Sequence, residues 1–274
     1  MKLKKEFKIY FRKAVDFLRN KKTLKILGAG IVLIIIVSGA YFYKYYTSPL
    51  KIGFIADIHA GDQSNRSDGE EAINVLIPNS FEKNVSGALQ EMEDSDLIIA
   101  LGDSLNRPSR KNTRKLLEIT EDYPMVWVKG NHDKLLHYNE LLSKERYRYI
   151  DKKGWRVIVL DNSATYPNKS SIDEHGRGLI DEEQLAWLKK SLQTKKNVVI
   201  AMHLPMLKRG DFNTIREDYK YLEELFIQSG NVKHIFSGHL HIYDEQIERN
   251  GIMHHLVPSI SLESRQGFYY KIEL

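Results

Sequence analysis

Uninterrupted apolar runs alternate with amphipathic stretches over most of this chain. The runs are short and rich in β-branched residues, which is typical of buried strands. They predict strands at residues 51–56, 97–101, 125–129, 155–161, 197–202 and 234–237. Apolar residues at helical spacing predict helices at 81–92, 111–121, 181–188 and 213–229, and residues 252–272 alternate as antiparallel strands do. This order indicates an α/β fold, with residues 51–274 forming one domain.

Five of the predicted strands end in polar residues that commonly bind metal ions. The motifs, in chain order, are Asp57-Ile58-His59, Gly102-Asp103, Gly130-Asn131-His132-Asp133, His203-Leu204-Pro205 and Gly238-His239-Leu240-His241. Open α/β sheets bind ligands at the carboxyl ends of their strands, so five such ends predict one shared site. The chain has no cysteine, which excludes thiolate ligands. Carboxylate and imidazole ligands without thiolate favour Mn, Fe or Zn over Ca.

In this order the five motifs resemble those of the calcineurin-like metallophosphoesterases. The Gly-Asn-His-Asp form of the third motif is most similar to the branch that contains the class III cyclic-nucleotide phosphodiesterases. A later helical pattern is also most similar to this branch, namely Glu183-Gln184-Leu185-Ala186-Trp187-Leu188. The resemblance covers residues 51–274 and departs at Ala56, where relatives often have Ser or Thr. It implies a four-layer α/β/β/α sandwich that holds two divalent metal ions.

The same resemblance implies a role for each motif residue. The first metal ion would be bound by Asp57, His59, Asp103 and His241. The second would be bound by Asp103, Asn131, His203 and His239, so that Asp103 bridges the two. A hydroxide between the metals would attack phosphorus directly, and His132 would protonate the leaving oxygen or hydrogen-bond the phosphoryl group. The sequence thus predicts a hydrolase of phosphodiester or phosphomonoester substrates, and it identifies neither a substrate-binding residue nor an oligomeric state.

Two other kinds of protein are compatible with these residues. One is a non-catalytic binding module on the same fold, although such modules generally lack some of the seven ligands, and all seven are present here. The other is a structural site that binds only zinc, which would couple metal binding to folding without turnover.

Residues 26–43 are uncharged and almost wholly apolar. As a helix they span roughly 27 Å at about 1.5 Å per residue, close to the roughly 30 Å of a bilayer core. We therefore expect a transmembrane anchor here, followed by a short linker at residues 44–50. Ten Lys or Arg lie in residues 1–25, and this basic amphipathic tail is expected in the cytoplasm, with the domain on the other side. Ser38-Gly39-Ala40 leaves a cleaved signal peptide open as the alternative.

Net charge narrows the expected partners. The chain carries +5 at pH 7, but residues 1–25 alone carry +8, which leaves −3 for the remainder. No nucleic-acid-binding face is therefore predicted on the domain. An extracytoplasmic domain would act on envelope or lipid-linked phosphoesters, whereas a cytoplasmic domain would suit cyclic nucleotides.

Overall fold

The computed structural model describes residues 36–38, 48–61, 76–106, 110–133, 138–139, 142–163, 180–207 and 217–274. The chain divides into two compact units, Met1–Ser48 and Pro49–Leu274, and almost all described residues belong to the second. The predicted tail at 1–25 lies outside the described residues. So does the predicted anchor at 26–43, except for residues 36–38, which are helical. Among the described residues, no helix has the length and apolar character needed to cross a bilayer.

Four strands form the first sheet of the second unit. They are β1 (Lys51–Ile55), β2 (Leu97–Ala100), β3 (Met125–Trp127) and β10 (Tyr270–Glu273). Their order is β10-β1-β2-β3, with β1, β2 and β3 parallel and β10 antiparallel to β1. Nearly every residue of β1 and β2 is buried, since both faces of the sheet are covered. This explains why their sequences are continuously apolar instead of alternating.

Six strands form the second sheet. They are β4 (Arg148–Lys152), β5 (Trp155–Val159), β6 (Asn197–Ala201), β7 (Val232–Ser237), β8 (Glu245–Arg249) and β9 (Ile252–Leu256). Their order is β4-β5-β6-β7-β9-β8, and only the edge strands β4 and β8 pair antiparallel. The apolar pattern does not predict these two, because their residues are mostly polar and none is fully buried. It also does not predict that β9 runs parallel to β7.

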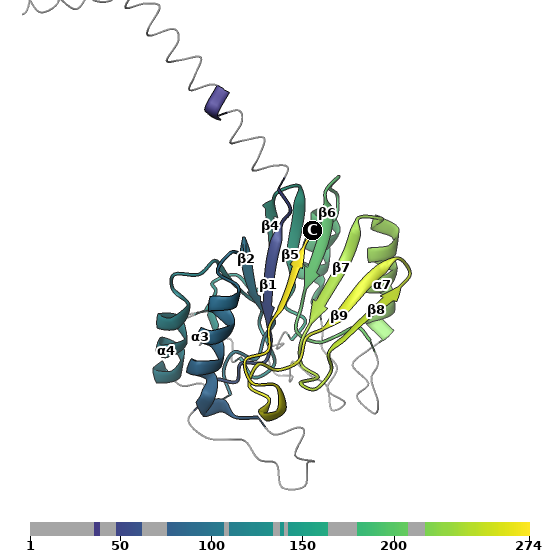
Figure 1. Cartoon of the computed structure of the whole chain (residues 1–274). Coiled ribbons are helices and arrows are strands. Elements are labelled where there is room, and N and C mark those ends of the chain that lie inside the picture. The colour runs from purple at the N-terminus through teal and green to yellow at the C-terminus, as the bar shows by residue number, and fades with distance from the viewer. Residues whose placement is uncertain are drawn as a thin grey trace, which may run out of the picture. The chain divides into compact units, whose positions relative to one another are not determined.

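Helices cover the outer face of each sheet and complete the four layers that the sequence predicts (Figure 1). They are α3 (Phe81–Glu91), α4 (Arg110–Thr120), α6 (Glu182–Ser191) and α7 (Glu217–Ser229), with short turns η2 (Pro78–Ser80) and η3 (Glu263–Arg265). Leu116 of α4 shares a buried cluster with Ile98 of the first sheet. Leu188 of α6 shares another with Ile200 of the second sheet.

A third buried apolar cluster lies between the two sheets. A stack of aromatic rings lies in the same region. The centroids of Phe54 and Phe236 are 3.8 Å apart, and the buried His255 stacks on Phe236 at 4.0 Å. His255 Nε2 lies 3.1 Å from Nδ1 of His234, and its own Nδ1 has no hydrogen-bond partner in the described part of the chain. Burial lowers the pKa of His255 to about 3, so this ring is neutral at pH 7.

The chain enters the second unit at the edge opposite to its polar motifs. It enters at Pro49, and β1 runs from Lys51 toward Asp57. At about 3.3 Å per residue, Lys51 and Asp57 lie roughly 20 Å apart. Because the parallel strands of both sheets end where their polar motifs begin, these motifs gather at the far edge.

The neutral His255 makes stability depend on pH. A histidine in the unfolded chain takes up a proton near its ordinary pKa of 6.5, whereas folded His255 does so only near pH 3. The unfolded state binds more protons between these values, so stability falls as the pH falls through this window. Acidification from about pH 7 to about pH 4.5 is expected to lower the urea midpoint, and to lower it less in His255→Phe. An equal drop in both proteins, followed by circular dichroism, would contradict a role for His255.

Candidate metal centre and active site

Seven polar side chains from five strand ends meet at the carboxyl edge of the two sheets. The first sheet supplies Asp57 and His59 after β1, Asp103 after β2 and Asn131 after β3, and the second supplies His203 after β6 and His239 and His241 after β7. Two groups have ligand atoms within 4.8 Å of one another. They are Asp57, His59, Asp103 and His241, and Asp103, His203 and His239. The structure thus brings together every ligand that the sequence predicts, and it places Asp103 in both groups.

The first group is compact, and three of its four side chains are buried, whereas His241 is 29% exposed. The Nε2 atoms of His59 and His241 face each other at 3.2 Å, and His241 Nε2 lies 3.5 Å from Oδ1 of Asp57. His59 Nε2 also lies 3.8 Å from Oδ2 of Asp103. The side chains of Asp57, His59 and Asp103 are at most 1% exposed. Four donor atoms from three strand ends therefore surround one point.

The second group is centred on His203. Its Nε2 atom lies 3.3 Å from Oδ2 of Asp103 and 2.9 Å from Oδ1 of Asn131. The ring of His239 lies 5.1 Å from that of His203, measured between centroids. Asn131 therefore lies beside this group by distance.

Backbone hydrogen bonds orient these ligands toward the shared centre. His203 Nδ1 lies 2.8 Å from the carbonyl of Leu101, so a proton on Nδ1 leaves Nε2 free to bind a cation. Asp57 uses Oδ2 to accept the N–H of His239 at 2.8 Å. Asp103 uses Oδ1 to accept the N–H of His132 at 2.8 Å. Each carboxylate thus keeps its other oxygen for the cluster.

The backbone at this site is strained. In the described part of the chain, seven non-glycine residues have positive φ, and five of them are predicted ligands. Their φ values are 50° for Asp57, 47° for His59, 48° for Asp103, 70° for His239 and 40° for His241. Such conformations cost of order 1–3 kcal/mol each and persist only where the surrounding structure enforces them. The sharp turn after each strand is what aims these side chains at one another.

Two motif glycines are required because the cluster leaves no room for a side chain. A Cβ atom at Gly130 would lie 2.1 Å from both the backbone N and Oδ1 of Asp103. A Cβ atom at Gly102, where φ is +93°, would lie 2.5 Å from Nδ1 of His203. Both glycines therefore allow the backbone to approach a ligand closely.

Burial has the largest influence on ionisation in the cluster. It lowers the pKa of His59 to about 3 and that of His239 to about 4. Burial also disfavours a charged His203, but the nearby Asp103 carboxylate raises the pKa of His203 to about 9. In return, despite its burial, Asp103 has a pKa well below the usual value because His203, His59 and His132 surround it.

The donor set fits divalent cations. Asp57 Oδ1 is buried and makes no hydrogen bond within the described residues. The Nε2 atoms of His59 and His241 lie 3.2 Å apart, so two imidazole donors are available beside this oxygen. Buried oxygen and nitrogen donors in this arrangement are the ligands that divalent transition metals prefer.

His132 differs from its neighbours in being accessible. Its side chain is 44% exposed, and its Nε2 atom lies 3.9 Å from Oδ2 of Asp103. Its ring meets the ring of His59 edge-on at 5.1 Å. It therefore lies at the mouth of the site, where it can reach a molecule bound to the cluster.

Asp133 ties two ligand loops together. Its carboxylate accepts the N–H groups of Gly130, Ser104 and Leu105, at 2.9, 3.2 and 3.1 Å. It thereby joins the loop after β3 to the loop after β2, which carries Asp103. The sequence places Asp133 in the Gly-Asn-His-Asp motif but does not predict that it connects two loops. The hydrogen bonds of its carboxylate show this role.

A buried lysine joins the two sheets behind the ligands. The Nζ atom of Lys129 donates to the carbonyl and hydroxyl oxygens of Ser163, both at 3.0 Å, and lies 3.9 Å from Oδ1 of Asp161. Ser163 Oγ in turn lies 3.0 Å from the carbonyl of Lys129. Lys129 precedes the Gly130 motif in the first sheet, whereas Asp161 and Ser163 follow β5 in the second.

Two amide side chains position the loops of the second sheet. Asn162 Oδ1 accepts the N–H groups of His203 and Leu204, at 3.2 and 3.1 Å. Gln184 bonds the backbone N–H and C=O of Asp161 through its amide, both at 2.8 Å. The carboxylate of Asp181 caps α6 by accepting the N–H of Gln184. Within the helical pattern at 183–188, Gln184 thus connects α6 to the loop after β5.

These features define a site suited to two metal ions. The family profile of calcineurin-like phosphoesterases matches residues 50–243, which include all seven ligands, and the chain belongs to this family. The protein is therefore a metal-dependent phosphoester hydrolase, as predicted.

Individual relatives agree with this assignment. The chain is 22% identical to a 3',5'-cyclic adenosine monophosphate phosphodiesterase, CpdA, from Haemophilus influenzae, over 85% of each chain. It is 25% identical to the glycerophosphodiester phosphodiesterase GpdQ of Enterobacter lignolyticus, over 67% of this chain and 69% of that one. It shares its fold with a dimetal phosphatase from Danio rerio, with a TM-score of 0.66 over 78% of this chain and 89% of that one, at 14% identity.

Substitution of Gly130 tests the close approach at the cluster. Gly130→Ala is expected to displace Asp103 and to lower the bound metal from two ions per chain to one or none, because Asp103 belongs to both groups. Elemental analysis after reconstitution with Mn measures the stoichiometry. Gly87→Ala is the matched control, since a Cβ atom there meets nothing within 4 Å. Two tightly bound ions in Gly130→Ala would contradict the assigned geometry.

Proposed function

We propose that the protein hydrolyses phosphodiesters at a centre of two divalent cations. The proposal depends on one observation, the two adjoining cation sites that share the buried Asp103. When bound, two such cations activate water and stabilise the charge that develops on phosphoryl oxygens. Mn, Fe or Zn suits these oxygen and nitrogen donors. Asp57, His59, Asp103 and His241 would hold one cation, and Asp103, Asn131, His203 and His239 the other.

His132 is the group we assign to the leaving oxygen. It is the accessible side chain at the mouth of the cluster, and its Nε2 atom lies within 4 Å of the shared Asp103. A positioned imidazole can donate a proton to an alkoxide as it leaves phosphorus. Alkoxides are poor leaving groups, so this role supports esters of alcohols over substrates that release acidic phenols. Several relatives also carry phosphodiesterase names.

We also propose that the protein is a single-pass membrane protein. The proposal rests on the uncharged apolar residues 26–43 and on the ten basic residues that precede them. The basic tail would then stay in the cytoplasm, and the hydrolase domain would lie outside it. Envelope or lipid-linked phosphoesters become the expected substrates in that case. A cytoplasmic domain would instead meet cyclic nucleotides, the compounds named for several relatives.

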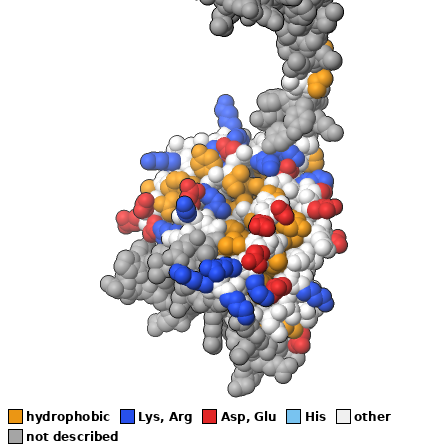
Figure 2. Space-filling model, turned by 90° about the vertical axis from the view of Figure 1, so that its left-hand side faces the viewer, with side chains coloured by type: hydrophobic (Ala, Val, Ile, Leu, Met, Phe, Trp, Pro, Cys, Tyr) orange, Lys and Arg blue, Asp and Glu red, His pale blue; other side chains and the backbone are white. Residues whose placement is uncertain are grey.

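Nucleic acids are not favoured as substrates. Basic and acidic side chains are interspersed on the face of the domain that Figure 2 shows, instead of forming one basic surface. Lys115 of α4 also pairs with Glu82 of α3. The −3 charge left after removal of residues 1–25 agrees with this. Binding of a polyanion needs a contiguous positive surface.

The role of His132 can be tested with two diesters that differ in their leaving group. His132→Ala is expected to lower kcat about 100- to 10,000-fold for glycerophosphocholine, whose alkoxide needs a proton, and much less for bis(4-nitrophenyl) phosphate. Asp103→Asn should abolish turnover of both in the presence of Mn. Equal losses for both diesters in His132→Ala would indicate that His132 binds the phosphoryl group and donates no proton. Inactivity of the unaltered protein with each of several metals would contradict the proposed function.

The membrane topology predicts which side of the cell surface carries the domain. Protease added to intact cells is expected to digest residues 51–274, while a tag on the N-terminus stays protected. Immunoblotting of both ends measures the outcome, and permeabilised cells provide the control. Resistance of the domain to protease in intact cells would indicate that it lies in the cytoplasm. Cyclic nucleotides would then be the expected substrates.

A further inference from the structure

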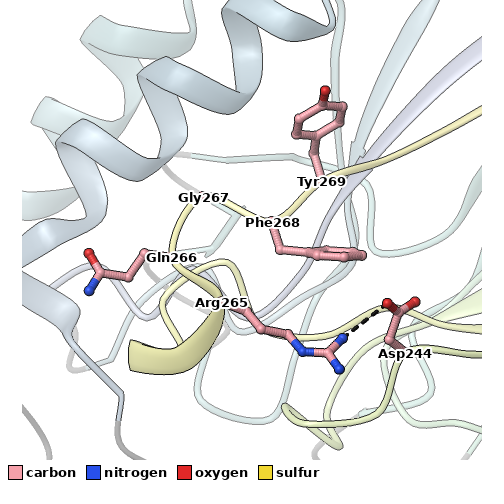
Figure 3. Close-up of a pocket in the computed structure, with 6 residues that line it drawn as sticks. All are labelled: Asp244, Arg265, Gln266, Gly267, Phe268 and Tyr269. Atoms are coloured by element: carbon pink, nitrogen blue, oxygen red, sulfur yellow. Dashed lines mark hydrogen bonds and ion pairs between the residues drawn. The ribbon is translucent and has the colours of Figure 1, made fainter.

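A surface pocket lies outside the set of residues used so far. It has a volume of about 420 Å³ and is lined by Asp244, Arg265, Gln266, Gly267, Phe268 and Tyr269 (Figure 3). These residues come from two segments, the loop between β7 and β8 and the stretch from η3 to β10. We call it the side pocket. None of its residues belongs to the metal cluster.

One of the two segments that build the side pocket carries metal ligands, and the other is hydrogen-bonded to the strand end that carries Asp57. Asp244 lies three residues after His241 in one loop. In the other segment, Ile260 donates its N–H to the carbonyl of Ala56, which directly precedes Asp57, and Gly267 donates to the carbonyl of Ile260, at 3.0 Å in both cases. Two backbone hydrogen bonds therefore separate the pocket from the strand end that carries Asp57.

The order of the first sheet places the pocket on one side of the cluster and His132 on the other. His132 follows β3, at one edge of the sheet β10-β1-β2-β3. Phe268 precedes β10, at the other edge, and the ligand-bearing ends of β1 and β2 lie between them. Neighbouring strands are about 4.8 Å apart. A diester whose leaving group points to His132 would therefore extend its other ester group toward the side pocket.

The chemistry of the pocket wall favours a flat group. Phe268 is half-buried, because part of its ring packs against the core between the sheets. Arg265 pairs with Asp244 at 3.0 Å, and both side chains are 39% exposed. Figure 3 shows Arg265 and Phe268 extending toward Asp244, whereas Gln266 and Tyr269 point elsewhere. An aromatic face beside a neutralised ion pair suits an aromatic ring, which stacks on one face and meets polar groups at its edge.

We propose that the side pocket binds the ester group that stays on phosphorus, and that Phe268 selects a flat aromatic group at this position. The inference rests on the proposed diester hydrolysis. The pocket thereby supplies the specificity that the metal cluster lacks, because the cluster contacts only the phosphoryl group. Phe268 contributes a stacking surface, and the Arg265–Asp244 pair forms the polar rim.

Two diesters with the same leaving group test this role. Phenyl 4-nitrophenyl phosphate and methyl 4-nitrophenyl phosphate release the same nitrophenolate and differ only in the group that remains. With Mn bound, the unaltered protein is expected to show a higher kcat/KM for the phenyl ester. Phe268→Ala is expected to lower the ratio of the two kcat/KM values about tenfold, mainly through KM of the phenyl ester. Phe268→Tyr keeps a ring and should preserve most of the ratio.

Controls separate specificity from damage to the fold. Tyr221→Ala removes an exposed ring on α7 and should leave the ratio unchanged. If Phe268→Ala does not fold, Phe268→Leu keeps the bulk without the ring and should still lower the ratio. An unchanged ratio in the folded Ala or Leu variant overturns the role of Phe268. Failure of the unaltered protein to hydrolyse either ester overturns the proposed function, and the pocket assignment with it.

Discussion

The ligands of the metal cluster come from two separate sheets, so the site exists only if the sheets are held at a fixed offset. Asp57, His59, Asp103 and Asn131 belong to the first sheet, and the three other histidines belong to the second. The apolar layer between the sheets provides most of the attraction, because it buries side chains from both. A layer of apolar contacts is not directional, however. It allows small shifts of one sheet against the other that would separate the ligands.

Directional contacts at the carboxyl edge limit such shifts. The buried Lys129 reaches from the first sheet to the backbone and hydroxyl of Ser163 in the second. Asp133 fixes two loops of the first sheet to each other, and Asn162 fixes two loops of the second. Buried polar groups must be matched in geometry or they cost free energy, so this network tolerates one arrangement. That arrangement is the one in which the strained ligand backbones converge.

Much of this site could be predicted from the sequence, for a physical reason. A strand buried on both faces must be apolar throughout, so a polar residue directly after it is conspicuous, as at Asp57 or His203. The edge strands β4 and β8 lack that constraint and were not predictable from apolar runs. The roles of Lys129 and Asn162 were also not predictable, because their partners lie 34 and 41 residues away along the chain. Local patterns carry no information about such pairings.

The direction in which the chain enters the domain has a consequence for access to the metal cluster. Residue 49 and the metal cluster lie at opposite edges of the sheets. A segment attached at residue 49 would therefore join the domain at the edge opposite to the metal cluster. Such an attachment would not need to cross the edge at which the carboxyl ends of the parallel strands meet.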